Sequence, residues 1–89
     1  MNQMELSFNA RIENEPFART SVASFITSLN PTIDELVEIK TIISEGVSNA
    51  IIHGYPDGVH TVIVRCRTED QTVQVQVIDE GVGIADIHQ

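Results

Sequence analysis

Residues 43–54 read ISEGVSNAIIHG, a largely apolar stretch that three polar side chains, Glu45, Asn49 and His53, interrupt. The apolar residues around them have the spacing of an α-helix with one buried face. In such a helix the three polar side chains follow one another at intervals of four residues and lie along one side. This side is either a solvated flank with a histidine at its end, or half of a binding site that needs a second element.

The helix that carries this stretch is predicted to begin at Thr32. Thr32 and Glu35 have the spacing of a capping box, in which each side chain accepts a hydrogen bond from the other residue's backbone. The apolar residues that follow at helical spacing are Leu36, Ile39, Ile43, Val47, Ala50 and Ile51. We expect the helix to run to about His53, with Gly54 as its C-terminal cap.

An earlier helix is predicted between Asn14 and Asn30. Asn14 is a suitable N-cap, Pro16 stands near the first helical position, and Asn30-Pro31 ends the pattern. The core-facing residues would be Ala18, Val22, Phe25, Ile26 and Leu29. The same periodicity places Arg19 on the exposed side, either as a solvated charge or as a contact for a protein partner.

Three stretches alternate between apolar and polar residues, which predicts half-buried strands. They are residues 4–10, 59–67 and 72–77, and the polar connection 68–71 predicts that the last two form an antiparallel hairpin. The order strand, helix, helix, strand, strand indicates an α+β fold, a two-layer sandwich whose helices cover one face of the sheet. Residues 79–89, DEGVGIADIHQ, are predicted as a loop without a further element. Because a sheet this narrow ends abruptly there, we expect one domain, truncated after this loop.

Composition excludes several functional classes. The 89 residues include no run of about 20 apolar residues that could span a membrane, and the first residues do not resemble a secretory signal. Cys66 is the single cysteine, so no internal disulfide forms; we expect a cytoplasmic protein with Cys66 in its core. The net charge is −8 and the five basic residues are scattered, which makes nucleic acid an unsuitable partner.

A second motif, DEGVG at residues 79–83, follows the last predicted strand. A carboxylate at a strand end, such as that of Asp79, can accept a hydrogen bond from a ligand amine. Gly81 and Gly83 have no Cβ, so the backbone there can turn sharply and approach a flat ligand closely. An ordinary tight turn capped by Asp79 would have the same sequence.

Taken together, the two motifs are more specific than either alone. A helix bearing EGVSNAIIHG, then a hairpin, then DEGVGI resembles the N box and G1 box of the GHKL (Bergerat-fold) ATPase and kinase superfamily. Within it, residues 9–19, NARIENEPFAR, and 30–55, NPTIDELVEIKTIISEGVSNAIIHGY, are similar to the anti-sigma serine kinases of endospore-forming bacteria.

The resemblance implies a nucleotide site that holds ATP or ADP with Mg²⁺. It implies that Asn49 is a ligand of Mg²⁺, and that Glu45, one helical turn earlier, is the general base for the substrate serine. Asp79 would read the adenine amine. Gly81 and Gly83 would let the loop pass close to the base, and His53 would flank the site.

The resemblance also implies protein partners. They are sigma factor F, held inactive by a homodimer of this protein, and an anti-anti-sigma factor that is phosphorylated on serine; Arg19 would contact a partner. The family's domain continues into an ATP lid and a second glycine-rich segment, whereas this sequence ends at Gln89. We therefore expect the 89 residues alone to bind nucleotide weakly and to have little or no kinase activity. Two alternatives remain open: a sigma-binding module without catalysis, and the ATP-binding domain of a sensor histidine kinase.

Overall fold

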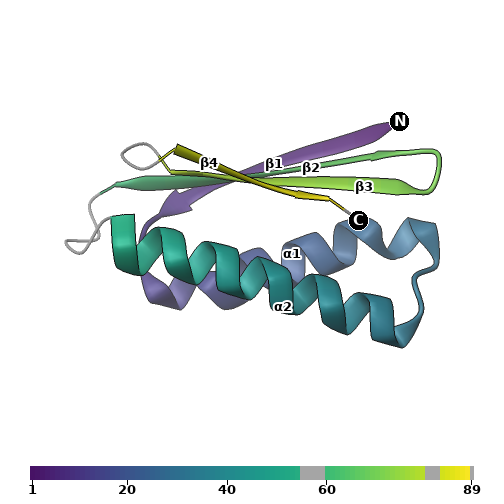
Figure 1. Cartoon of the computed structure of the whole chain (residues 1–89), viewed down its shortest axis with the longest axis horizontal. Helices are drawn as coiled ribbons and strands as arrows, with labels where there is room; N and C mark the ends of the chain where they lie inside the picture. The colour runs from purple at the N-terminus through teal and green to yellow at the C-terminus, as the bar shows by residue number, and fades with distance from the viewer. Residues whose placement is uncertain (55–59, 80–82, 89) are drawn as a thin grey trace.

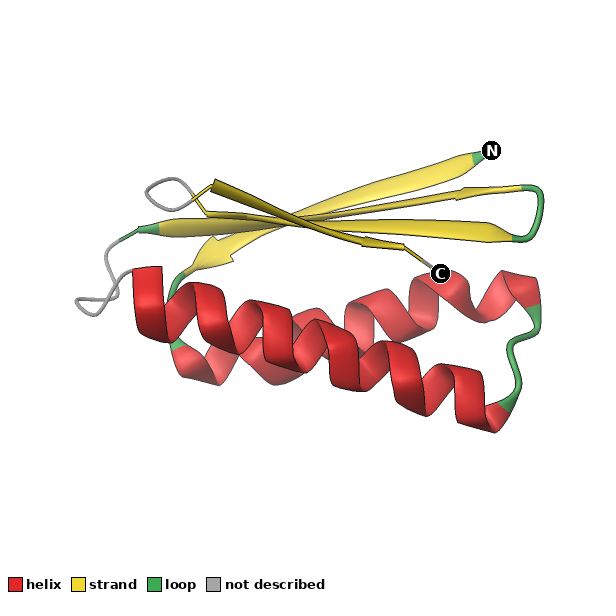
Figure 2. Cartoon of the chain, in the orientation of Figure 1, coloured by secondary structure: helices red, strands yellow, loops and turns green. Residues whose placement is uncertain are grey.

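The computed structural model describes residues 1–54, 60–79 and 83–88. In chain order its elements are β1 (Asn2–Asn9), the 3-10 turn η1 (Ile12–Asn14), α1 (Glu15–Phe25), the 3-10 turn η2 (Ile26–Leu29), α2 (Ile33–Asn49), the π-helical turn η3 (Ala50–Gly54), β2 (Thr61–Glu69), β3 (Thr72–Asp79) and β4 (Gly83–His88). The two long helices pack on each other and lie on one face of an antiparallel sheet (Figures 1 and 2). The α+β class predicted from the sequence is confirmed.

The sheet has the strand order β1-β2-β3-β4. The three predicted strands and the hairpin are confirmed, but the expectation that residues 79–89 form a loop without a further element is wrong. Residues 83–88 pair antiparallel with β3. The physical reason is that β3 would otherwise be an edge strand, and a segment that returns antiparallel pairs its outward N–H and C=O groups.

The core lies between the helices and the sheet. From β2 it receives Val62, Val64 and Cys66, and from β3 Val73, Val75 and Val77, all at most 5% exposed. The predicted inward faces of both strands are therefore correct. Ile39, Ile43 and Val47 of α2, Ala18 and Val22 of α1 and Ile26 of η2 pack against them from the helical side. Within the described residues, neither helix combines the length and apolar character that a membrane crossing requires.

The start of α2 agrees with the sequence prediction. Thr32 Oγ1 accepts from the backbone N–H of Glu35 at 3.1 Å, and a Glu35 carboxylate oxygen accepts from the backbone N–H of Thr32 at 2.8 Å. Asn14 does stand at the N-cap of α1, but its side chain makes no capping bond. Its amide nitrogen instead donates to the carbonyl oxygen of Asn9 at 2.9 Å, because η1 turns that side chain back toward the end of β1.

Two connections are tighter than predicted. The α-helical part of the first helix ends at Phe25, and η2 leads to Asn30, whose φ of 52° ends the helical segment in the left-handed region. The polar connection predicted at residues 68–71 shrinks to Asp70 and Gln71, with φ angles of 54° and 66°. Two successive residues with positive φ form the turn that matches the twist of a β-hairpin, so β2 continues to Glu69.

Candidate functional site

Glu45 and Asn49 lie on the solvent side of α2, opposite its core-facing residues Ile43 and Val47. Both polar side chains are exposed, and they are one helical turn apart, about 6 Å along the helix axis. Neither makes a side-chain hydrogen bond or ion pair with another described residue. A carboxylate and an amide are thus presented together on rigid backbone, and both are available to a ligand.

The helix changes its winding directly after Asn49. The α-helix was expected to continue to about His53, but residues 50–54 form the π-helical turn η3. A π turn closes i→i+5 hydrogen bonds and therefore places residues differently around the axis from an α turn. The regular line from Glu45 through Asn49 does not extend to His53 in α-helical register, and the side chain of His53 lies outside the described part of the structure.

Asp79 is the last residue of β3 and is only 6% exposed. It continues the alternation of Val73, Val75 and Val77, so its side chain lies on the helix-covered side of the sheet. Its partner across the strands is Val62, which is fully buried. A carboxylate in such apolar surroundings needs hydrogen-bond donors to offset its lost hydration.

The end of β3 lies close to the end of α2. The turn η3, which directly follows Asn49, packs against β3, and both lie at the same end of the molecule (Figure 1). On its other side Asp79 pairs with Gly83 of β4. Because cross-strand partners project to the same face, any residue larger than glycine at position 83 would place a side chain next to the Asp79 carboxylate. Gly81 falls outside the described residues.

Arg19 lies on α1 and is less exposed than its spacing predicts. Its side chain is 39% exposed, and its Nε is 3.6 Å from Oε2 of Glu15, one turn earlier. Glu15 was not singled out in the sequence analysis, although it is 9% exposed. The available signal was its spacing, three and seven residues before the core residues Ala18 and Val22, which places it on the buried stripe.

Cys66 belongs to the core and takes no part in this site. It is 1% exposed, and burial raises the pKa of its thiol to about 12. The reactive thiolate is therefore essentially absent at neutral pH. The prediction of a core cysteine is confirmed.

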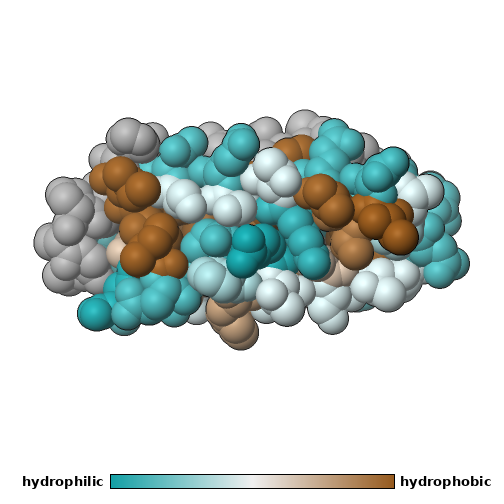
Figure 3. Space-filling view, turned by 90° about the horizontal axis from the view of Figure 1, so that it is seen from below, coloured by the Kyte–Doolittle hydropathy of each residue, from teal (hydrophilic) through white to brown (hydrophobic). Residues whose placement is uncertain are grey.

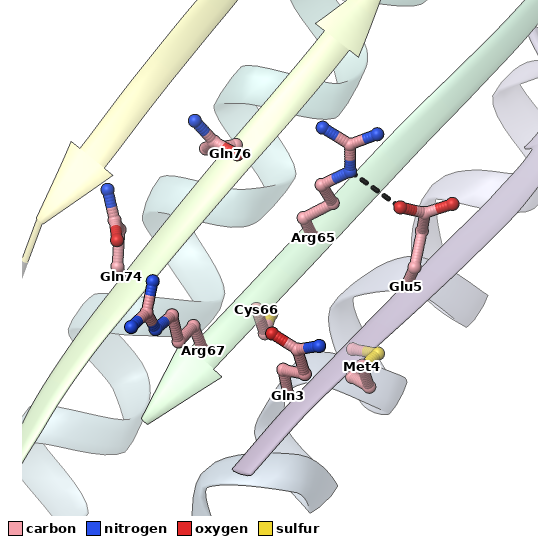
Figure 4. Close-up of a pocket in the computed structure, with 8 residues that line it drawn as sticks. All are labelled: Gln3, Met4, Glu5, Arg65, Cys66, Arg67, Gln74 and Gln76. Atoms are coloured by element: carbon pink, nitrogen blue, oxygen red, sulfur yellow. Dashed lines mark hydrogen bonds and ion pairs between the residues drawn. The ribbon is translucent and has the colours of Figure 1, made fainter. Parts of the chain in front are cut away.

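A separate hollow of about 500 Å³ lies over β1, β2 and β3 on the face of the sheet that the helices leave bare (Figure 4). Arg65, Arg67, Gln74 and Gln76 line it together with Gln3, Met4, Glu5 and Cys66. Arg65 is ion-paired with Glu5, and Arg67 with Glu69. None of the predicted site residues lines this hollow. The hollow is therefore distinct from the candidate site, which lies where α2 and β3 end at Asn49 and Asp79.

The described residues contain no group of three or more histidine, cysteine, aspartate or glutamate side chains that could hold a metal ion. A cation at Asn49 would therefore need most of its ligands from a bound molecule. Mg²⁺ accepts such an arrangement, because it keeps several waters and commonly takes phosphate oxygens of a nucleotide alongside few protein ligands.

Comparison with known proteins agrees with this geometry. The sequence profile of the family described as "Histidine kinase-like ATPase domain" matches residues 8–89. The chain is 57% identical over 89 residues to the anti-sigma F factor of Geobacillus thermodenitrificans, covering 97% of this chain and 60% of that protein. It is 54% identical over 87 residues to the anti-sigma F factor of Oceanobacillus iheyensis, again covering 97% and 60%. The chain thus spans about 60% of the length of these curated relatives.

Proposed function

The chain belongs to the histidine kinase-like ATPase domain family, as its N-box and G1-box motifs indicated, and on that premise we propose that it is the nucleotide-binding domain of a cytoplasmic anti-sigma factor that is also a serine-protein kinase. The proposal takes the 89 residues as one domain with the two-layer arrangement of the Bergerat fold. Its substrate class is a serine hydroxyl of a protein, and its role is in the control of sporulation transcription.

One observation carries the nucleotide site: a carboxylate, Asp79, is buried at the end of β3, opposite Gly83 and beside the turn that follows Asn49. This carboxylate is suited to accept from the exocyclic amine of adenine, in surroundings apolar enough to hold the base. The glycine opposite leaves room for a flat ring. Gly81 and His53 would border the same site.

The residues at the end of α2 fit the phosphate and metal part of ATP. The exposed amide oxygen of Asn49 suits one position on Mg²⁺, with phosphate oxygens and waters completing the coordination. Bound ATP would supply its terminal phosphoryl group and leave as ADP, and Mg²⁺ held there would offset charge on the phosphates. Glu45, one turn earlier, would hold the proton of the substrate serine as that oxygen attacks, which is the role of a general base.

The proposed partners are sigma factor F, an anti-anti-sigma factor as protein substrate, and a second copy of the chain in a homodimer. The curated relatives are named anti-sigma F factors. Apolar side chains are exposed on the helical elements, among them Phe17 at 55%, Ile33 at 81% and Val37 at 56%. The space-filling view of the helical side shows apolar groups toward both ends of the molecule with polar residues between them (Figure 3). Arg19 on α1 would add a charged contact on the helical layer.

The alternative of a sensor histidine kinase domain shares the fold but has a different substrate. The relatives that match nearly the whole chain at 54% and 57% identity are named anti-sigma F factors, and this observation favours the serine kinase.

Calorimetric titration tests the nucleotide site. Mg-ATP and Mg-ADP are titrated into the full chain and into Asp79→Asn. Losing a charge-assisted hydrogen bond should weaken affinity by about 10- to 100-fold. Asp86→Asn, which removes the same charge from β4, serves as the control and should bind as the native chain does. Equal affinity of the native chain and Asp79→Asn would contradict the assignment of Asp79.

A further inference from the structure

β1 stands at one edge of the sheet and pairs only with β2 (Figure 1). The pairing continues past the end of the strand, where the N–H of Ala10 donates to the carbonyl oxygen of His60 at 2.7 Å. In an antiparallel pair, residues that bond to the neighbouring strand alternate with residues whose N–H and C=O groups point away from it. The residues of β1 whose backbone groups point outward are therefore Gln3, Glu5, Ser7 and Asn9.

Both ends of this outer edge are already closed by local hydrogen bonds. At one end, the side-chain oxygen of Asn2 accepts from the backbone N–H of Gln3 at 3.0 Å. At the other end, the carbonyl oxygen of Asn9 accepts from the backbone N–H of Arg11 at 2.7 Å and from the side-chain amide of Asn14 at 2.9 Å. A strand from another molecule therefore finds few free backbone groups at either end of β1.

The middle of the edge is open. In the part of the chain that the structure describes, the outward N–H and C=O groups of Glu5 and Ser7 bond to no other residue. β1 also contains neither proline nor lysine, two residues that protect other edge strands. The four open groups match two residues of an added antiparallel strand, each of which would exchange a pair of N–H···O bonds with β1.

The helix-facing side of the same segment has apolar surface that is incompletely covered. Met4, Leu6 and Phe8 pack against the core but are only partly buried. By contrast, Val64 of β2 and Val75 of β3 are at most 1% exposed, because a strand lies on each side of them. An added strand with apolar side chains on this side would complete the cover of β1.

On the bare face of the sheet, charge favours a basic residue in the added strand. The side chain of Glu5 is 53% exposed and pairs with Arg65 on the β2 side (Figure 4). A lysine or arginine opposite Glu5 on the outer side would make a second favourable cross-strand pair. The net charge of −8 attracts a basic segment, and β1 has no basic residue with which a second copy of the chain could supply the pair.

We propose that the outer edge of β1 binds an extended segment of a protein partner by strand addition, through the outward backbone groups of Glu5 and Ser7. The segment has apolar residues opposite Leu6 and Met4, and a lysine or arginine between them, opposite Glu5. This surface is separate from the nucleotide site, and the proposal does not depend on that site.

The test uses an amidated heptapeptide, TVTVKVT, labelled with fluorescein at its N-terminus, titrated with the full chain and followed by fluorescence anisotropy. Ser7→Pro removes an N–H at the open middle of the edge, and the matched control Gln3→Pro removes one at the closed end. Both variants should fold, because proline is tolerated where the N–H of an edge strand points to solvent. Ser7→Pro should weaken binding by about tenfold or more, and Gln3→Pro should change it by about twofold at most.

Modified peptides test the same contact on the native chain. Methylation of the backbone nitrogens of the lysine and the middle threonine removes the two donors that face β1, and should weaken binding by about tenfold or more. Methylation of the central valine nitrogen, which points away from β1, should weaken it by about threefold at most. This comparison decides the question alone if Ser7→Pro does not fold.

Three results would overturn the proposal. The first is no binding of the heptapeptide to the native chain, and the second is equal weakening by Ser7→Pro and Gln3→Pro or by the two kinds of methylation. The third is a dimer of the native chain that Ser7→Pro converts to a monomer in analytical ultracentrifugation, because a second copy would then occupy the edge.

Discussion

The two ends of α2 are built in opposite ways. At its start, Thr32 and Glu35 bond to each other's backbone N–H groups, so the helix satisfies its own unpaired donors. At its end, the α-helix gives way to the π turn η3, and the last exposed polar side chains, Glu45 and Asn49, bond to no other described residue.

This difference indicates that the start of α2 contributes to stability, whereas its end is suited to binding a ligand. A capping box adds stability to the helix and leaves nothing for a ligand. Polar side chains without partners beside a π turn add little to stability, but they can serve a ligand, and π turns are frequent at functional sites. Substitutions at the start of α2 should therefore change unfolding, and substitutions at its end should change chemistry.

The largest effect is expected for Glu45→Gln. In a chimaera that carries these 89 residues in place of the matching part of the Geobacillus thermodenitrificans relative, phosphotransfer to the anti-anti-sigma factor should fall by about 100-fold or more, because the proposed general base is lost. Radiolabelled ATP measures the rate. The melting temperature should stay unchanged, since Glu45 is exposed.

The matched control is Glu38→Gln, which removes another exposed carboxylate from the same helix. It should leave the rate within about twofold of the unsubstituted chimaera, since surface substitutions away from a site have small effects. If Glu45→Gln transfers phosphate as fast as the control, the proposed role of Glu45 as general base is wrong.

A smaller effect is expected at the start of the helix. Thr32→Ala removes the capping side chain and should lower the free energy of unfolding by about 1 kcal/mol. Urea unfolding followed by circular dichroism measures this, and Thr41→Ala, at an exposed position inside the same helix, provides the comparison. Affinity for Mg-ADP should not change in either variant. A loss of nucleotide affinity in Thr32→Ala would contradict the claim that the start of α2 affects only stability.

The capping contribution should also depend on pH. Hydrogen bonds from Thr32 lower the pKa of Glu35 below its ordinary value of 4.5. The bond from the Thr32 backbone has the larger effect and the bond from its side chain the smaller. A group whose pKa is lowered by folding stabilises the protein above its ordinary pKa, and this contribution is lost as the pH falls through the lowered value. The stability difference between the native chain and Thr32→Ala should therefore shrink below about pH 4.5. A difference that stays constant down to pH 3 would contradict the capping role of Glu35.

Local sequence patterns predicted the parts of the fold that depend on neighbouring residues. The alternation of Val73, Val75 and Val77 gave the inward face of β3, and the Thr32–Glu35 spacing gave the capping box. The prediction that residues 79–89 form a loop was wrong because the pairing of β4 with β3 requires a neighbouring strand edge. Asn14 stands at the predicted N-cap, but its side chain turns to Asn9 because η1 precedes the helix.

The sequence predicted which residues belong to the candidate site better than it predicted how they are arranged in space. Spacing alone placed Glu45 and Asn49 on one side of α2, and the motif DEGVG marked Asp79. The burial of Asp79 and the closeness of η3 to β3 follow only from the packing of α2 on the sheet. Glu15 was missed because a charged residue on a helix is normally assigned to solvent, while only its position on the apolar stripe shows that it is buried.

The most direct test of the central claim is whether Asp79 reads adenine. Mg-ADP and Mg-IDP, whose base carries a carbonyl oxygen in place of the exocyclic amine, are titrated into the full chain and into Asp79→Asn. The account predicts that the native chain binds ADP about tenfold or more tightly than IDP, and that this preference is lost in Asp79→Asn. Equal affinity of the native chain for the two nucleotides, or a preference that survives in Asp79→Asn, would contradict it.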